Sequence, residues 1–247
     1  MDIDDILADL DQSVTPAFSD AALDHQLLTR FWVSERVAPE VLRWPTDLME
    51  RVMSRVREQT ETIEDMTAGM DERGASGSTT ITSHSNLVLS ILQTDLSRTQ
   101  YMVRSLLRQR LAKLTRHAMH YLTLNGKEKT EDQLLSPQEQ SFLQNHQTLL
   151  SDLYAASFLS AFPPRLQRLD DNAGGLNMVE APDGRKAVFV RCLAERWTNI
   201  GSNKDLDEEE EARAAESGTL FMRRGQIWVV RWEDVKKGID LGALELL

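Results

Sequence analysis

The sequence is poor in the features that mark secreted, membrane and disulfide-stabilised proteins. Its 247 residues include one cysteine, Cys192, so no intramolecular disulfide can form, which is typical of a reducing compartment. No apolar run approaches the roughly 20 residues that a membrane-spanning helix needs. The N-terminus is acidic and lacks the basic start of a signal peptide. We therefore predict a soluble, intracellular protein.

Acidic residues outnumber basic ones. The chain has 28 Lys and Arg residues against 39 Asp and Glu residues, which gives a formal net charge of −11. A general nucleic-acid binder gains affinity by neutralising phosphates with basic side chains. The charge balance argues against that class, although it leaves room for a local basic patch.

Motifs for catalysis or metal binding are missing as well. Gly69 and Gly74 have the spacing of a phosphate-binding loop, but the lysine that such a loop requires is absent. His117 and His120 share one helix face without a third ligand in view, and Cys192 falls in a predicted strand, where a core thiol is the expected role. We therefore expect no enzyme activity, no cofactor and no metal site.

The dominant feature of the sequence is a long stretch suited to a single helix. Residues 84–122 contain neither Gly nor Pro, and as one helix they would span about 58 Å. Apolar residues recur at spacings of three and four and cover roughly half of the circumference. We expect such a helix to be packed on several sides, by its own domain or by partner subunits. Its main apolar stripe includes Leu92, Leu96, Val103, Leu107, Leu111 and Leu114.

Arg110 falls within that stripe. A cation among apolar side chains needs a carboxylate or carbonyl partner. We therefore predict that Arg110 is buried and paired, inside the chain or across an interface. The neighbouring cations have two interpretations, a solvated face or a track for a DNA phosphate backbone. These cations are Arg98, Arg104, Arg108, Lys113 and Arg116.

The first 18 residues are acidic yet carry one apolar helix face. Ile3, Ile6, Leu7 and Leu10 follow helical spacing, and aspartates near the start suit the helix dipole. A helix this short is marginal alone. It either docks on its own domain or forms a tethered peptide that folds into the groove of a partner.

Residues 19–162 have the pattern of an all-α domain of four to five helices. Ser19 suits an N-cap, Pro45 suits a first helical turn, and residues 71–83 and 125–135 have loop compositions. Residues 136–139 predict a helix start with a capping box. The apolar side is Leu23, Leu27, Phe31 and Val37 in the first helix and Phe142, Leu149, Leu150, Leu153 and Phe158 in the last.

Residues 163–175 are a flexible linker by composition, and residues 176–247 have the pattern of a small β-rich domain. We expect hairpin turns at Asp183-Gly184 and Arg224-Gly225, and an exposed loop at the acidic run 205–211. The predicted fold class is therefore α+β, an N-terminal all-α domain with one very long helix followed by a small β-rich C-terminal domain. The expected strands are 176–180, 187–193, 219–222, 227–230 and 243–247, with a short helix at 232–237.

Four segments, taken in order, carry a resemblance to a known family. They are the acidic opening 1–11, the long-helix segment 94–114, the run from 135–139 on to 158, and the closing module with 189–191, 228–232 and 244–247. In this order and spacing they resemble the Sld-type subunit of GINS, the heterotetramer of the eukaryotic replicative helicase. The opening segment resembles that of fungal members. The match covers nearly the whole chain.

The resemblance implies a non-catalytic structural subunit that acts in the nucleus, with three Psf-type paralogues as partners. Within the assembly of MCM ring, Cdc-type cofactor and GINS, it would support initiation and fork progression in DNA replication. The alternative is a DNA-binding scaffold protein that uses the basic face of the long helix.

The resemblance also implies two sets of contact residues. The N-terminal peptide would dock on the trimeric β-propeller hub that links the helicase to polymerase alpha. The positions that match this peptide are Asp4, Asp5, Ile6, Leu7, Asp9 and Leu10. The subunit interface is expected at Leu92, Leu96, Val103, Leu107, Arg110, Leu111, Leu114, Phe142, Tyr154, Trp228 and Trp232.

Overall fold

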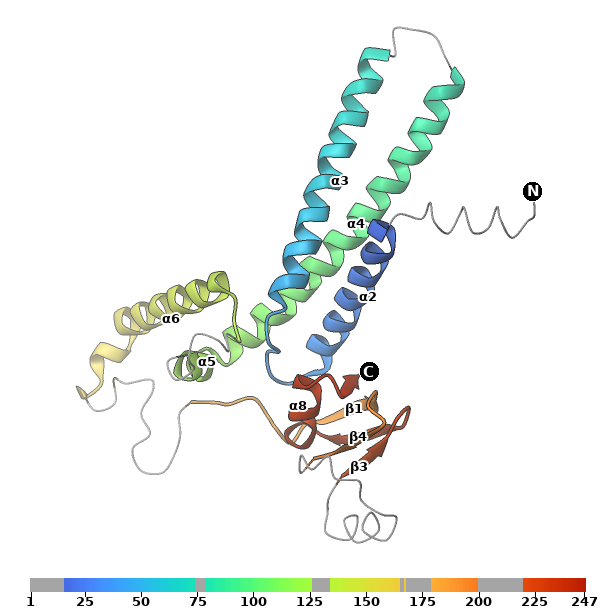
Figure 1. Ribbon diagram of the computed structural model, residues 1–247. Helices are drawn as coiled ribbons and strands as arrows, with labels where there is room; N and C mark the ends of the chain where they lie inside the picture. Colours follow the sequence, from blue (N-terminus) through green and yellow to red (C-terminus); the bar gives the residue numbers. More distant parts are fainter. Residues whose placement is uncertain (1–15, 74–78, 126–133, 165–166, 168–178, 200–219) are drawn as a thin grey trace. The chain divides into compact units, whose positions relative to one another are not determined.

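The computed structural model describes residues 16–73, 79–125, 134–164, 167, 179–199 and 220–247. Helices come first and a small antiparallel sheet with one helix follows, which confirms the predicted α+β class (Figure 1). The helical elements are α2 (Pro16–Val37), α3 (Thr46–Arg73), α4 (Thr79–Arg116), α5 (Ala118–Asn125), α6 (Pro137–Ser157), the 3-10 turn η1 (Leu159–Ala161) and α8 (Trp232–Asp240). The strands are β1 (Ala187–Cys192), β2 (Arg196–Thr198), β3 (Phe221–Arg223), β4 (Ile227–Arg231) and β5 (Leu244–Leu246).

The chain divides into two compact units, and helices α2 and α4 contribute residues to both. The first unit holds residues 1–32 and 45–106. Here α3 and α4 lie side by side and run in opposite directions (Figure 1). Leu28 of α2, Val52 of α3 and Leu106 of α4 are buried in its core. The Trp32 indole N–H also donates to the Ser105 hydroxyl at 3.0 Å.

Two expectations for this unit are wrong in detail. Leu23 was expected on the apolar side of α2, but it is 54% exposed, and Asp24 faces inward instead because its carboxylate binds Arg51 and Arg55. The predicted loop 71–83 is shorter, since α3 runs to Arg73 and α4 begins at Thr79. Ser and Thr suggest a loop by composition, but they are well tolerated in a first helical turn.

The long helix predicted over 84–122 is interrupted at His117, where α4 ends and α5 turns away from its axis (Figure 1). Two contacts lie at the bend. The Thr115 hydroxyl donates to the carbonyls of Leu111 and Ala112, at 2.9 and 3.1 Å. The buried His117 ring lies with Nδ1 3.0 Å from the Glu180 carbonyl oxygen. Neither contact could be predicted from the spacing of the apolar residues.

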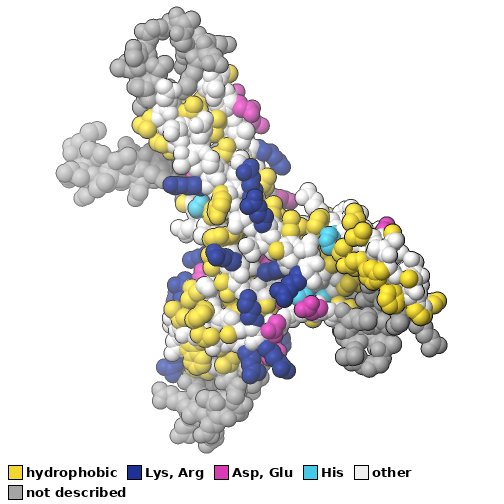
Figure 2. All heavy atoms as spheres, turned by 180° about the vertical axis from the view of Figure 1, so that it is seen from behind, with side chains coloured by type: hydrophobic (Ala, Val, Ile, Leu, Met, Phe, Trp, Pro, Cys, Tyr) yellow, Lys and Arg dark blue, Asp and Glu magenta, His cyan; other side chains and the backbone are white. Residues whose placement is uncertain are grey.

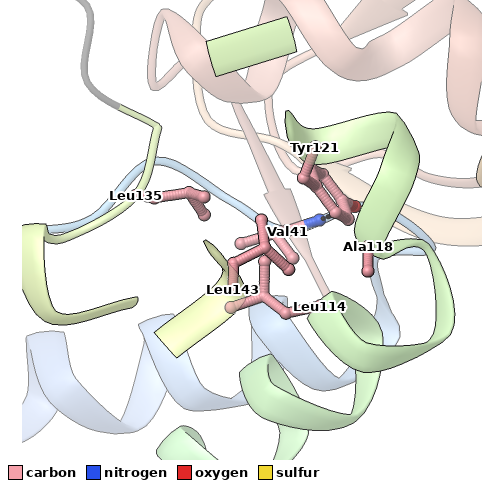
Figure 3. Packing of buried hydrophobic residues seen from close by; sticks show 6 residues of the cluster. All are labelled: Val41, Leu114, Ala118, Tyr121, Leu135 and Leu143. Carbon is pink, nitrogen blue, oxygen red and sulfur yellow. Dashed lines mark hydrogen bonds between the residues drawn. The ribbon is translucent and has the colours of Figure 1, made fainter. Parts of the chain in front are cut away.

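The second unit holds residues 33–44 and 107–247. Its helical part packs around one apolar cluster, shown in Figure 3, in which the Tyr121 hydroxyl accepts a hydrogen bond from the Val41 backbone N–H at 3.0 Å. Burial raises the pKa of the Tyr121 hydroxyl above its ordinary value. The cluster consists of Val41, Leu114, Ala118, Tyr121, Leu135 and Leu143.

Helix α6 begins where the sequence predicts. Ser136 is its N-cap, Pro137 lies in the first turn, and the Ser136 and Glu139 side chains each bind the other's backbone N–H, which confirms the capping box. The predicted apolar side is not a core face, however. In the helix only Glu139 and Leu143 are buried, while Leu149 and Leu153 are exposed.

The β-rich part has a three-stranded sheet with the order β4-β1-β5 and a separate pair, β2-β3. Most of the expected strands are confirmed, while β2 was not predicted and the described residues Val179 and Glu180 are not in a strand. The acidic run 205–211, the linker prediction over 168–175 and most of the loop 125–135 lie outside the described residues.

Neither predicted turn closes a hairpin among the described residues. Asp183-Gly184 precedes β1, and across Arg224-Gly225 strand β3 pairs with β2 while β4 pairs with β1. The pairs Arg191 with Ile227 and Arg196 with Arg223 differ by one residue in register, so one extra residue lies between β1 and β2 where the chain bends from one ladder to the other. Gly225 has φ +83° at this bend, which glycine adopts without strain.

One face of the three-stranded sheet forms the core of this module. Cys192 is buried there as a free thiol, as predicted, and burial raises its pKa. Helix α8 contributes Trp232 and Val235 to the same core. A Cβ added at Gly238 of α8 would lie 2.6 Å from the Trp197 indole nitrogen, so only glycine lets this helix pack so closely.

Candidate functional site

Arg110 lies at the centre of a buried ion-pair cluster in the second unit. Its Nη1 donates to Glu35 Oε2 at 2.9 Å and to the Leu42 carbonyl at 2.7 Å. Its Nε and Nη2 donate to the two carboxylate oxygens of Glu139 at 2.7 and 3.0 Å. Arg110 and Glu35 are fully buried and Glu139 nearly so. The prediction of a buried, paired Arg110 is confirmed, and both partners belong to its own chain.

Lys113 extends the cluster by one helical turn. Its ammonium donates to Glu35 Oε1 at 2.7 Å and to the Glu40 carbonyl at 2.8 Å, and it also contacts the Glu35 carbonyl. Burial lowers the pKa of Lys113, and the Glu35 charge opposes that shift. The Trp44 ring lies 5.0 Å from the Arg110 guanidinium carbon, a cation–π contact.

The charges of this cluster have a structural role, because each of them is paired. Burial alone would lower the pKa of Arg110, but the hydrogen bonds and charges of Glu139 and Glu35 outweigh it and raise the pKa. Both carboxylates are held by cations, and the Glu139 carboxylate also caps α6. Neither is available as a general base. The cluster fixes α2, α4 and the start of α6 against one another.

A surface of another kind lies along α6 and η1. Leu149 is 66% exposed and Leu153 is 56% exposed, and Phe142, Phe158 and Phe162 are exposed as well. We call these five residues the α6 face. Figure 2 shows hydrophobic side chains gathered over this helix. From residue 137 to 164 the sequence has two charged residues, Glu139 and Asp152, and Glu139 is buried.

The α6 face is partly ordered by its own contacts. The rings of Tyr154 and Phe158 lie 5.6 Å apart, and those of Phe158 and Phe162 lie 6.2 Å apart in an edge-to-face arrangement. A contiguous exposed apolar surface of this kind, with one exposed charge, is typical of a protein–protein interface. Its apolar residues follow helical spacing, which suits a partner helix.

The predicted interface residues are distributed unevenly. Four of them are buried inside the chain itself, namely Val103, Arg110, Leu114 and Trp232. Five are half-buried, namely Leu92, Leu96, Leu107, Leu111 and Tyr154, while Phe142 and Trp228 are exposed. The predicted partner-binding peptide, Asp4 to Leu10, lies outside the described residues. The interface therefore stays a prediction.

Leu149 and Leu153 were absent from the predicted interface, although they are the most exposed members of the α6 face. The signal that could have revealed them is the scarcity of charge over residues 137–164, because a helix exposed only to water would carry more charged side chains.

One residue of the basic face considered for DNA binding is engaged inside the chain. Lys113 points into the ion-pair cluster and cannot contact a phosphate backbone there. Within the described residues no group of His, Cys, Asp and Glu side chains has the geometry to hold a metal ion. No described helix is both long and apolar enough to cross a bilayer.

Comparison with known proteins decides the family. A model described as the GINS complex protein helical bundle domain matches residues 53–158, and one described as DNA replication complex GINS protein SLD5 C-terminus matches residues 182–247. A protein of Chaetomium globosum named DNA replication complex GINS protein SLD5 is 39% identical, with both chains fully covered. The chain belongs to the fungal Sld5 family of GINS subunits.

Other Sld5 relatives extend over the same length. The protein of that name from Debaryomyces hansenii is 32% identical over all of this chain and 98% of its own. The one from Schizosaccharomyces pombe is 28% identical over 97% of this chain and 99% of its own. Sld5-family membership makes this chain a structural component of a GINS complex in DNA replication, with other GINS subunits as partners. The α6 face is then a candidate contact surface for one of them.

Proposed function

We propose that this chain is a non-catalytic structural subunit of the GINS heterotetramer and works in the nucleus with three Psf-type paralogues. The tetramer joins the Cdc-type cofactor to the MCM ring, and in that assembly it supports initiation and fork progression. Family membership supports the assembly role, and the resemblance in the sequence supports the place in the helicase.

The observation that carries the proposal is the α6 face. Leu149, Leu153 and Phe158 leave large apolar areas in water, and covering each with a partner would contribute about 1 kcal/mol or more. The Arg110–Glu139 ion pair anchors the first turn of the same helix, so the surface is held on a rigid element. A pre-organised apolar surface loses little conformational entropy on binding.

The test is co-purification with the three paralogues after co-expression. Leu149→Glu should weaken the complex at least tenfold, because the new carboxylate would be buried against apolar side chains. Leu149→Glu combined with Leu153→Glu should abolish it. Leu241→Glu is the control, since Leu241 is 81% exposed and lies outside the α6 face. An intact complex with the double variant, or its loss with Leu241→Glu, would contradict the proposal.

We also propose a role for each of four segments of the chain. Residues 1–18 serve as a tether, 19–162 as the helical domain, 163–175 as a linker and 176–247 as the β-rich domain. In the tether, the apolar side chains Ile6 and Leu7 and the flanking aspartates would dock on the trimeric β-propeller hub. Ile6→Ala with Leu7→Ala should abolish hub binding and leave the tetramer intact. Loss of the tetramer would mean that this segment belongs to the core.

A further inference from the structure

The outer face of the three-stranded sheet carries an apolar row that nothing in the described residues covers. Val229 on β4 is paired with Phe189 on β1, and the Leu247 backbone N–H donates to the Phe189 carbonyl at 3.1 Å. The three side chains therefore stand side by side across the sheet. Phe189 and Val229 are 56% and 57% exposed, and Ile227, on the same face of β4, is 58% exposed.

Beside this row, β4 has a free edge within the described part of the chain. The sheet order is β4-β1-β5, so β1 lies on one side of β4 and no described strand lies on the other. The Cys192 N–H donates to the Gln226 carbonyl and the Trp232 N–H donates to the Lys186 carbonyl. In an antiparallel pair the bonded positions alternate. The backbone groups of Ile227, Val229 and Arg231 therefore point away from β1, toward the free edge.

Cations stand at both ends of this edge. Arg224 precedes β4 and is exposed, and Arg231 ends it with a mostly exposed side chain that lies 3.9 Å from Glu233. On the same face, the Glu245 carboxylate is paired with Arg191. The edge thus offers backbone donors and acceptors, an apolar row and an exposed arginine at each end.

We propose that the outer edge of β4 binds an extended segment of another protein by strand addition. The bound segment has aliphatic side chains opposite Val229, which continue the apolar row, and carboxylates at its two ends, which meet Arg224 and Arg231. Main-chain hydrogen bonds supply affinity in this binding mode and the side chains supply selectivity. None of these residues belongs to the α6 face, and none is among the residues predicted for the subunit interface, although Trp228 of the same strand is.

The charges and side chains argue for this occupant over two others. A second copy of this chain, paired antiparallel through β4, would bring its own arginines toward these arginines. A single-stranded nucleic acid gains its affinity from a positively charged groove together with several aromatic rings on which successive bases stack. Phe189 is the one aromatic side chain in the apolar row, and Ile227, Val229 and Leu247 are aliphatic.

The probe is a short fluorescein-labelled peptide in which valines alternate with threonines between glutamates at both ends. Its binding to the full-length chain is followed by fluorescence anisotropy. Val229→Pro removes an N–H that faces the free edge and leaves the bonds to β1, and edge strands tolerate such a proline. We expect binding about tenfold or more weaker. Val229→Thr keeps the N–H and is the matched control, with affinity within about threefold of the wild type.

Charge reversal gives a second test that does not alter the backbone. Arg224→Glu with Arg231→Glu should weaken binding of the glutamate-ended peptide and tighten binding of a peptide that has lysines in place of the glutamates. Four results would overturn the proposal. They are unchanged affinity of Val229→Pro, no charge preference in the reversed variant, displacement of the peptide by a single-stranded oligonucleotide, and a dimer of this chain that Val229→Pro abolishes.

Discussion

At the scale of single residues, Arg110 illustrates how a charged group is accommodated in an apolar interior. Three of its nitrogens donate to Glu35, Glu139 and the Leu42 carbonyl, and Trp44 covers its guanidinium plane. Each partner comes from a different stretch of the chain. Such a cluster adds little net stability compared with an apolar core, but losing one member leaves uncompensated charges in a dry environment.

Arg110→Leu should therefore destabilise the fold by about 3–5 kcal/mol, because Glu35 and Glu139 would lose their shared cation. Urea unfolding followed by circular dichroism measures the change. Arg108→Leu on the same helix is the control, since Arg108 is exposed, and it should shift stability by less than about 0.5 kcal/mol. Equal changes in the free energy of unfolding for the two substitutions would show that the cluster does not hold these helices together.

Asp24 makes the free energy of unfolding depend on pH in the acidic range. Hydrogen bonds and charge from Arg51, together with those from Arg55, lower the pKa of this buried carboxyl against the opposing effect of burial. The unfolded chain then binds the proton more readily than the folded chain. The stabilisation is therefore present above the ordinary carboxyl pKa and is lost as the pH falls through the lower, folded value.

The free energy of unfolding should thus decrease as the pH falls below about 4, and Asp24→Asn should make that decrease shallower. Chemical unfolding at a series of pH values measures the slope. Asp152→Asn, at an exposed position on α6, should leave the slope as it is in the wild type. An unchanged slope in Asp24→Asn would show that Asp24 does not contribute to the pH dependence of stability.

At the scale of elements, the sequence predicted those features that depend on local chemistry. The capping box at Ser136 follows from the preference of serine and glutamate for those positions, and β1 follows from its short run of valine and phenylalanine, which favour strands. The end of α4 at His117 could not be predicted, because the apolar spacing continues past it and the ring contact there is with Glu180, far along the chain. Apolar spacing also could not tell a core face from an exposed one, as α6 shows.

The β-rich part shows the same limit. Gly225 marks a change of chain direction, but whether the flanking strands pair with each other depends on β1 and β2. Strand β2, Arg196–Thr198, has one apolar residue, Trp197, and therefore gives no apolar run or alternation. Of the candidate site, the pairing of Arg110 could be predicted from its polarity, whereas its partners Glu35 and Glu139 could not be named.

Two helical glycines should respond to alanine in opposite ways. Gly238→Ala should destabilise the β-rich module by about 1–3 kcal/mol, because the new Cβ would overlap the Trp197 ring and Leu244. Gly69→Ala in α3 meets nothing within 4 Å and should stabilise the helix by about 0.5–1 kcal/mol. Thermal unfolding of the two variants measures both changes. A stabilised Gly238→Ala would contradict the close packing of α8 on Trp197.

At the scale of the whole molecule, charge and apolar surface are separated along the sequence. Residues 1–15 carry five aspartates and no cation, while residues 137–164 have a single exposed charge. The acidic segment suits a tethered peptide and the apolar helix suits a stable subunit contact. A chain arranged in this way is expected to complete its folded surface only with partners.

The most direct test is the mass of the complex formed when the full chain is co-expressed with the three Psf-type paralogues proposed as its partners, measured by light scattering on a sizing column. We expect one complex with one copy of each subunit, which does not form when any of the three is left out. If this chain eluted as a well-folded monomer in the presence of all three, the α6 face would not be an assembly surface and the proposed role in the tetramer would be wrong.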